Sequence, residues 1–237
     1  MQSDIINTIV FIGPTGVGKS RLINYLAEKD VAKTANTLQS VTKGLQCYCV
    51  NPQDSTHGFL FVDTQGVCDT TMSNADVVSL ISDALKNKVK KVNYFILMIK
   101  SGRMTDENRK AIEQLITEFD LVERKNHVYV LVTNCEILNG QALTRLENEV
   151  CADRTLKKLL KMEKSSTSSC HEVVNLSFTG LPDPKDVNVL MMDGVRKWME
   201  VQRKPLMKYI SKPISAIEPN LRCQTKHIDL FQILHCS

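Results

Sequence analysis

Apolar and β-branched residues gather in six short runs along the chain, and most of the segments between them show the spacing of amphipathic helices. Such short runs predict strands, whereas apolar positions that recur every three or four residues predict helices. Alternation of the two indicates an α/β fold with a mainly parallel sheet. The predicted strands are 5–12, 45–50, 58–64, 92–99, 127–134 and 172–179, and the predicted helices are 18–29, 74–91, 105–119, 141–164 and 186–210.

One pair of strands departs from this alternation. Only the segment NPQDSTHG separates 45–50 from 58–64, which is too short for a crossover, so these two strands should form an antiparallel hairpin. The strands at 92–99 and 127–134 are almost entirely apolar, which is typical of the centre of a sheet covered on both faces. We therefore predict a three-layer sandwich with a six-stranded, mainly parallel sheet, one antiparallel strand, helices on both faces and a C-terminal helical extension.

The segment GPTGVGKS, residues 13–20, lies where the first predicted strand turns into the first predicted helix. It fits the template GxxxxGK[ST] of the phosphate-binding loop, in which glycines let the backbone wrap around a phosphate and backbone amides face it. We expect Lys19 to reach the β- and γ-phosphates and Ser20 to ligate Mg²⁺. An ordinary glycine-rich turn is the alternative, but the strand before and the helix after favour the P-loop. The expected nucleotide contacts are Gly13, Thr15, Gly16, Val17, Gly18, Lys19, Ser20 and Arg21.

The third predicted strand ends in FLFVDTQG, residues 59–66. A carboxylate at the tip of a buried strand beside the loop is where P-loop enzymes hold Mg²⁺ through water, so Asp63 is a predicted metal residue, with an Asx-type turn as the alternative. Gly66 can present its N–H to a γ-phosphate. The DTxG pattern favours GTPases over kinases and most ATPases. Val67 stands where many small GTPases place a water-orienting glutamine, and Gln65 comes one position too early, so slow intrinsic hydrolysis is expected.

A polar stretch, 36–46, separates the first helix from the second strand. A threonine in such a stretch closes over Mg²⁺ and the γ-phosphate in GTP-loaded switches and lets go after hydrolysis. Thr42, just ahead of the second strand, is the predicted switch residue and metal ligand. Thr34 and Thr37 are alternatives.

The fifth predicted strand ends in TNCE, residues 133–136, where GTPases carry [NT]KxD. The acid of that motif accepts hydrogen bonds from guanine that adenine cannot supply. We therefore predict guanine recognition, with Glu136 as the reader and Asn134 beside it; a polar cap on the strand end is the alternative. Asn175 and Ser177 come near the position expected for a final base-contacting loop.

The bulk composition describes one ordinary domain rather than an unusual chain. The protein has 237 residues, 43% of them hydrophobic and 24% charged, with a formal net charge of +4. We expect a nucleotide-binding domain over 1–212 and a tail over 213–237. The basic clusters of the chain alternate with apolar residues as solvated helix faces do, so nucleic acid is not an expected partner.

No apolar stretch approaches the ~20 residues of a membrane span. We expect a cytoplasmic protein without an evident anchor, leaving membrane association open. The eight cysteines form no CxxC pair, and most are expected to be reduced.

The segment SGRMTDENRKAIEQLITEFD, residues 101–120, together with GPTGVGKS, SVTKGLQ and FVDTQG, resembles the immunity-associated nucleotide-binding proteins, the GIMAP class of septin-like GTPases. The resemblance spans roughly 6–210. It implies a guanine-nucleotide-binding domain with GTP and GDP as ligands, a strand order of the Ras type and an extra C-terminal helix. It further implies slow turnover, GTP-dependent dimerisation through the nucleotide face and, in some members, membrane association through C-terminal extensions.

Arg103 lies in that segment, just after the fourth predicted strand. An arginine there could reach the transferring phosphate of a partner molecule in a dimer and supply charge that Val67 lacks; a solvated surface arginine is the alternative. We therefore expect a Mg²⁺-dependent GTPase with Lys19, Thr42, Gly66 and Arg103 as its catalytic residues. The competing interpretation is a nucleotide-binding interaction module with negligible hydrolysis.

Overall fold

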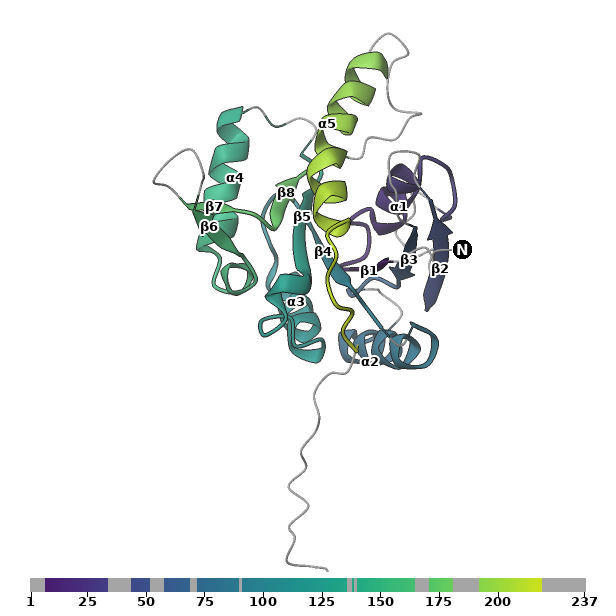
Figure 1. The fold of residues 1–237 in the computed structure, drawn as a ribbon. Helices are drawn as coiled ribbons and strands as arrows, with labels where there is room; N and C mark the ends of the chain where they lie inside the picture. The colour runs from purple at the N-terminus through teal and green to yellow at the C-terminus, as the bar shows by residue number, and fades with distance from the viewer. Residues whose placement is uncertain are drawn as a thin grey trace, which may run out of the picture.

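The computed structural model describes residues 7–33, 44–51, 58–68, 72–89, 91–135, 138, 140–164, 171–180 and 192–218. A six-stranded sheet with the order β2-β3-β1-β4-β5-β8 forms its centre (Figure 1). β2 runs antiparallel to β3, and the other neighbours are parallel, as predicted from the hairpin and the crossovers. The strands are β1 (Asn7–Ile12), β2 (Leu45–Val50), β3 (Phe59–Thr64), β4 (Tyr94–Lys100), β5 (Val128–Thr133) and β8 (Leu176–Phe178).

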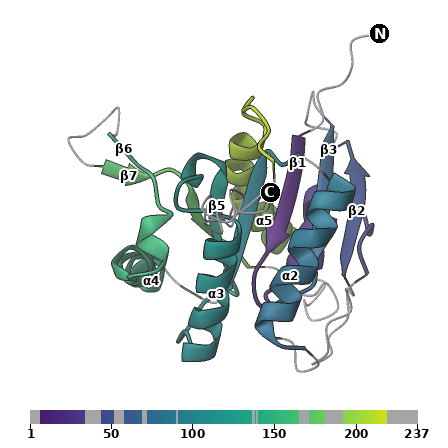
Figure 2. The ribbon, with the colours of Figure 1, turned by 90° about the horizontal axis from the view of Figure 1, so that it is seen from below.

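Helices cover both faces of the sheet, so the predicted three-layer arrangement is confirmed (Figure 2). α1 and α5 pack on one face, and α2, α3 and part of α4 pack on the other. No helix within the described ranges is both long and apolar enough to cross a membrane. The helices are α1 (Lys19–Ala27), α2 (Asn74–Ala84) with a π-helical turn at Leu85–Val89, α3 (Asp106–Glu118), α4 (Gly140–Ala152) and α5 (Met192–Ile210), with 3-10 turns at Lys125–His127 and Leu156–Lys158.

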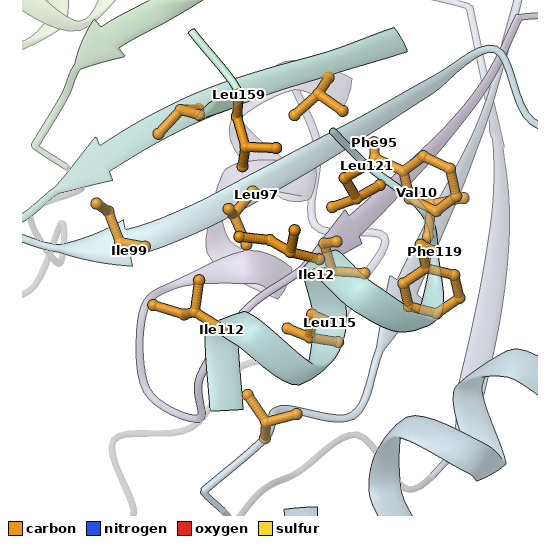
Figure 3. Packing of buried hydrophobic residues seen from close by; sticks show 14 of the residues in the cluster. Val10, Ile12, Phe95, Leu97, Ile99, Ile112, Leu115, Phe119, Leu121 and Leu159 are labelled. Atoms are coloured by element: carbon orange, nitrogen blue, oxygen red, sulfur yellow. The ribbon is translucent and has the colours of Figure 1, made fainter. Parts of the chain in front are cut away.

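Strand side chains alternate between two apolar layers, as the two-residue period of a strand requires. Along β1, Ile9 and Phe11 pack towards α1 and α5, whereas Val10 and Ile12 pack towards α2 and α3. Figure 3 shows the second layer, where strand side chains meet those of α3. The ring of Phe95 stacks on that of Phe119 with a centroid distance of 5.3 Å. Burial on both faces explains why β4 and β5 are apolar throughout.

α5 and the chain that follows it are held at the amino ends of the strands. The Tyr209 ring lies 5.3 Å from Tyr94 and 4.8 Å from Tyr129, measured between centroids. Asn93 Nδ2 then donates to the carbonyl of Ile214 at 3.0 Å, while Asn93 Oδ1 accepts from the backbone amide of Thr8 at 2.8 Å. The first residues of the predicted tail, up to residue 218, therefore lie against the domain; 219–237 fall outside the described residues.

α5 is also joined to the end of α1. Arg203 Nη2 donates to the carbonyl of Leu26 at 3.3 Å, and its Nη1 lies 2.7 Å from Glu28 Oε1. The last carbonyls of a helix have no intrahelical partner, so this arginine satisfies one of them. The contact fixes α1 at the end remote from residues 13–18.

Two predicted elements are wrong. The run 172–179 is not one strand: β7 (His171–Val173) pairs with β6 (Met162–Lys164) outside the main sheet, and only β8 joins β5. The predicted helix 141–164 ends at Ala152, because Asp153 Oδ1 accepts hydrogen bonds from the amides of Thr155 (2.9 Å) and Leu156 (3.1 Å) and so starts a turn. Short acidic side chains compete with the helix ladder in this way.

Asp153 generates a stability prediction, since its Oδ2 also accepts a hydrogen bond from Arg109 Nη1 of α3 at 2.6 Å. Burial raises the pKa of Asp153, but the hydrogen bonds from Arg109 and from the two amides outweigh it, so the net pKa lies below its usual value. Asp153→Ala should lower the free energy of unfolding by about 1–2 kcal/mol at pH 7.

The folded-state pKa is depressed, so this stabilisation is present above the unfolded pKa of about 3.9 and is lost as pH falls through the folded value. Urea unfolding at pH 7 and near pH 3 should show a smaller difference between wild type and Asp153→Ala at the lower pH. Asp153→Asn, which keeps an oxygen for the two amides, should cost less than the alanine. An unchanged difference at both pH values would contradict the electrostatic role.

Candidate functional site

The carboxyl ends of β1, β3, β4 and β5 lie at one edge of the sheet, because these strands are parallel. The segment 13–18 joins β1 to α1 at this edge, and 65–68 follows β3 beside it. In open α/β sheets, ligands bind at this edge. The structure therefore brings together the two motifs that the sequence places about fifty residues apart.

Gly13 is a position that no other residue can occupy without displacing the sheet. A Cβ atom there would lie 2.2 Å from the carbonyl oxygen of Met98 in β4, and its φ is 144°. The backbone of the loop consequently lies directly on β4. Gly16 is exposed, Val17 is buried, and Gly18 precedes the first residue of α1 with a φ of 93°.

The loop and the segment after β3 are joined as if the sheet continued beyond its strands. The amide of Thr15 donates to the carbonyl of Val67 at 2.8 Å, and the amide of Val67 donates to the carbonyl of Gly13 at 3.3 Å. Gly66 is pressed against this contact, since a Cβ atom there would lie 2.5 Å from the Thr15 backbone nitrogen. A side chain at residue 66 is thereby excluded, which leaves the Gly66 backbone bare beside the loop.

Lys19 lies inside the loop rather than in solvent. Its Nζ donates to the carbonyls of Gly13 at 3.0 Å and Pro14 at 2.9 Å, and the residue is only 7% exposed. Burial lowers the pKa of Lys19 to about 8, against the opposing influence of Asp63. A cation held in this way can move a short distance to a phosphate, whose negative charge would raise the pKa of Lys19 again.

Ser20 and Asp63 converge as the metal prediction requires. Ser20 Oγ donates to Asp63 Oδ2 at 2.6 Å, and Asp63 is buried at the end of β3. Hydroxyl and carboxylate oxygens are hard ligands suited to Mg²⁺, which takes few protein ligands and keeps several waters. These two side chains therefore fit a magnesium site. Thr42, the third predicted ligand, lies outside the described residues, as do Thr34 and Thr37.

Gln65 has a role that the sequence does not reveal. Its amide donates to the carbonyl of Gly44 at 2.9 Å, and its Oε1 accepts from the Gly44 amide at 3.3 Å. This pairing extends the β2–β3 ladder by one step beyond Leu45 and Thr64. The segment that leads into β2 is thus tied to the DTQG turn. The hairpin register, once known, would have identified this pair.

The predicted base-recognition segment follows β5 at the same edge. Thr133 is buried, and its hydroxyl donates to the carbonyl oxygen of Val17 at 3.0 Å, with the carbonyl oxygen of Ile99 as a second acceptor at 3.2 Å. Asn134 has a left-handed φ of 60°, its carbonyl accepts from Ser101 Oγ at 2.6 Å, and its side chain is exposed. Thr133 therefore couples this segment to the phosphate loop. Glu136 lies outside the described residues.

Asn175 is a wrong prediction as a base contact. It is fully buried next to the amino end of β5, and its Nδ2 donates to the carbonyls of Val128 at 3.0 Å and Leu159 at 2.8 Å. Its Oδ1 accepts from the amide of Lys161 at 2.7 Å. A side chain so engaged at the far edge of the sheet is structural.

Residues 179 and 180, rather than Asn175, lie beside the segment that follows β5. The amide of Thr179 donates to the carbonyl of Val132 at 2.8 Å, and the carbonyl of Thr179 accepts from the amide of Cys135 at 3.1 Å. Thr179 and Gly180 follow the carboxyl end of β8. Thr133 and Asn134 stand at the carboxyl end of the neighbouring strand β5. The sequence signal was present in FTG, where a polar residue and a glycine end the apolar run.

Arg103 and Arg21 lie at the same edge in different surroundings. Arg103 is exposed in the segment 101–105 between β4 and α3, which the amide of Ser101 anchors by donating to Thr133 at 2.9 Å. Arg21 is half-buried in the first turn of α1. The structure therefore leaves the Arg103 side chain on the surface at the carboxyl ends of β1, β3, β4 and β5, the edge where the predicted nucleotide contacts lie. We call this edge the nucleotide edge.

Gly66→Ala should disrupt the contact between loop and strand. The added methyl would overlap the Thr15 backbone, and we expect a loss of about 1–3 kcal/mol in the free energy of unfolding together with loss of nucleotide binding. Gly140→Ala is a matched control, since a Cβ atom at this first residue of α4 would meet nothing within 4 Å and the residue lies outside the loop. Chemical unfolding and nucleotide titration of both variants test this; equal effects would contradict it.

The lowered pKa of Lys19 predicts that the free energy of unfolding of the nucleotide-free protein depends on pH. Its folded pKa of about 8 lies below the unfolded value of 10.5, so between these values the unfolded chain binds more protons and stability rises with pH. The slope contributed by this one group reaches about 1.4 kcal/mol per pH unit. Unfolding of wild type and Lys19→Met at pH 7, 8, 9 and 10 should give a difference that is constant below pH 8 and grows in favour of wild type above it. Parallel profiles would contradict the prediction.

Comparison with curated proteins and solved structures finds a relative in sequence and several proteins of the same fold. Immune-associated nucleotide-binding protein 10 of Arabidopsis thaliana is 28% identical over 115 residues, a match covering 48% of this chain and 25% of that relative. Toc33 from Arabidopsis thaliana in complex with GDP and Mg²⁺ superposes with a TM-score of 0.63 at 13% identity, covering 90% of this chain and 88% of Toc33. Era of Aquifex aeolicus bound to GDP and AlF₄⁻ gives 0.56 at 15% identity, covering 91% and 60%.

These structural likenesses confirm the predicted P-loop NTPase fold, and the sequence comparison decides the family. The model of the AIG1 family matches residues 7–169, which is more than half of the chain. The predicted resemblance to immunity-associated nucleotide-binding proteins is confirmed. The chain belongs to the AIG1 family.

Proposed function

We propose that this protein is a guanine-nucleotide-binding GTPase that depends on Mg²⁺, turns over slowly and is stimulated by GTP-dependent dimerisation through its nucleotide edge. The observation that carries the proposal is the closed arrangement of Lys19 inside the loop with Ser20 and Asp63 meeting at 2.6 Å beside it. Toc33, which shares the fold, binds GDP and Mg²⁺ and has also been captured with Mg²⁺ and GMPPNP. Family membership and these neighbours support GTP as the ligand.

Ser20 and Asp63 would hold the metal, with Thr42 as the predicted third ligand. When bound, Mg²⁺ neutralises charge on the β- and γ-phosphate oxygens. Lys19 supplies a second positive charge from within the loop, and the backbone amides at the start of α1 add partial positive charge. The bare backbone at Gly66 lets its N–H approach the terminal phosphate. These groups bind and orient the polyphosphate and stabilise charge as the β,γ bond breaks in line.

The position after Gly66 supports slow hydrolysis. Val67 is fully buried, and both its amide and its carbonyl are bonded to the loop, so it offers nothing to an attacking water. A charge supplied from outside would compensate, and Arg103 is exposed at the right edge to give it across a dimer. For the chloroplast translocon components Toc33 and Toc159, dimerization is important for GTPase activity. That relationship supports a similar arrangement here.

The buried Val67 also favours the second candidate function, a nucleotide-loaded interaction module with negligible hydrolysis. Both candidates use the same binding edge and differ in whether assembly completes the catalytic apparatus.

Guanine specificity is proposed to come from Asn134 and Glu136, with Thr179 and Gly180 closing the base site beside Cys135. The cytoplasm stays the predicted location; the exposed thiols of Cys47 and Cys49 suit a reducing compartment.

Phosphate release measured against protein concentration tests the proposal. Specific activity should rise with concentration in wild type, and Arg103→Ala should lower the concentration-dependent part at least about tenfold while leaving GTP affinity unchanged. Arg154→Ala is a matched control, because Arg154 is an exposed arginine in the turn after α4. A flat profile near zero with intact binding would establish the interaction module instead.

Binding itself is tested separately. Labelled GTP should saturate wild type in the presence of Mg²⁺, GTP should compete far better than ATP, and Lys19→Ala should abolish uptake. Saturable uptake that is equal in wild type and Lys19→Ala would overturn the site.

A further inference from the structure

β2 is an edge strand of the described sheet (Figure 2). It carries the two thiols of Cys47 and Cys49. Tyr48 and Val50 pack towards the α1 side, so the alternate residues Cys47 and Cys49 point towards the α2 side. Both cysteines are exposed and neither forms a disulfide. The nucleotide edge uses neither of them.

The spacing of the two thiols suits a bridging ion better than a disulfide. Residues two apart in a strand have Cα atoms about 6.6 Å apart, with Cβ atoms roughly parallel. A disulfide needs Cβ atoms about 3.8 Å apart, so the pair could close only by distorting the strand. Two metal–sulfur bonds of about 2.3 Å each let the sulfurs stay about 4.6 Å apart, which the side chains reach by leaning together.

The described residues around the pair supply two sulfurs and complete no group of three metal-binding side chains. In the β2–β3 ladder, Cys47 lies opposite the buried Val62, and Cys49 lies opposite Leu60. No group of three or more histidine, cysteine or acidic side chains capable of holding a metal occurs among the described residues. With two sulfur donors and an apolar floor, the described part of this site does not meet the four-ligand preference of Zn²⁺ or the oxygen preference of Mg²⁺. Soft thiolate ligands select Cu(I), Zn²⁺ and iron–sulfur clusters, and of these Cu(I) is the one whose coordination two sulfurs can complete.

Lys88, in the π-helical turn after α2, adds a favourable charge. The ammonium group of Lys88 acts electrostatically on Cys47. Two thiolates and one monovalent ion carry a net charge of −1, which a nearby ammonium stabilises. Lys86, two residues earlier, faces Asp83 at 3.9 Å instead.

We propose that Cys47 and Cys49 form a two-coordinate site for a soft monovalent metal ion, of which Cu(I) is the physiological example. Each thiol releases one proton to solvent as its sulfur binds, and the ion keeps its oxidation state. The site is independent of the nucleotide, because it lies on the α2 face of the outer strand and contains none of the residues that bind phosphate.

Anaerobic titration of the reduced full chain with Cu(I), in competition with a chromogenic Cu(I) chelator, tests this proposal. Wild type should withdraw one equivalent from the chelator, and Cys47→Ser and Cys49→Ser should each weaken binding by about a hundredfold. The double variant should be no weaker than either single one, because one site needs both sulfurs. Cys151→Ser, which removes a half-buried free cysteine of α4, should behave as wild type. Equal affinity of wild type and the double variant, or loss confined to one cysteine, would overturn the site.

Two further arms separate charge and metal type. Lys88→Glu should weaken Cu(I) binding severalfold, whereas Lys86→Glu should not, and equal effects would remove the local role of Lys88. Zn²⁺ should compete poorly, and Zn²⁺ affinity equal to that of Cu(I) would overturn the two-coordinate soft site. GTP titration of the same variants should be unchanged, which verifies that the serine substitutions leave the fold intact.

Discussion

The contact between the loop after β1 and the turn after β3 is the constraint on which the site depends. Two backbone hydrogen bonds join Thr15 and Gly13 to Val67, and the approach is so close that residue 66 has no space for a side chain. Backbone hydrogen bonds of this kind fix position more firmly than long side chains, because they immobilise few rotatable bonds. The placement of Lys19 and the meeting of Ser20 with Asp63 follow from this junction, since both motifs extend directly from it.

The opposite edge of the sheet is closed by side chains instead. Asn93 bonds to Thr8 and to Ile214, and Tyr209 packs between Tyr94 and Tyr129. Buried polar groups must find partners, and these do so with backbone groups that strand ends and loops leave over. The molecule therefore has one edge where backbone amides stay accessible to a ligand and one edge where side chains satisfy the strand ends. That asymmetry concentrates binding capacity on a single side.

Much of this arrangement could be predicted from the sequence, because the residues that determine it lie in contiguous segments. The apolar runs of β4 and β5, the hairpin at β2 and β3 and the segment 13–20 each carry a local signal. The failures come from contacts between distant residues. Asp153 ends a helix whose apolar spacing continues beyond it, and the run containing Asn175 divides between two sheets. Gln65 with Gly44, and Thr133 with Val17, depend on strand register, which leaves no mark in either segment alone.

Asn175 has a wider consequence. Its side chain pins Leu159 and Lys161 to the first residue of β5, so the chain leaves for the β6–β7 hairpin and returns within one small region. The excursion begins and ends on the side of the sheet remote from the phosphate loop. A change of length within β6 or β7 can therefore be absorbed by this excursion without moving the loop after β1.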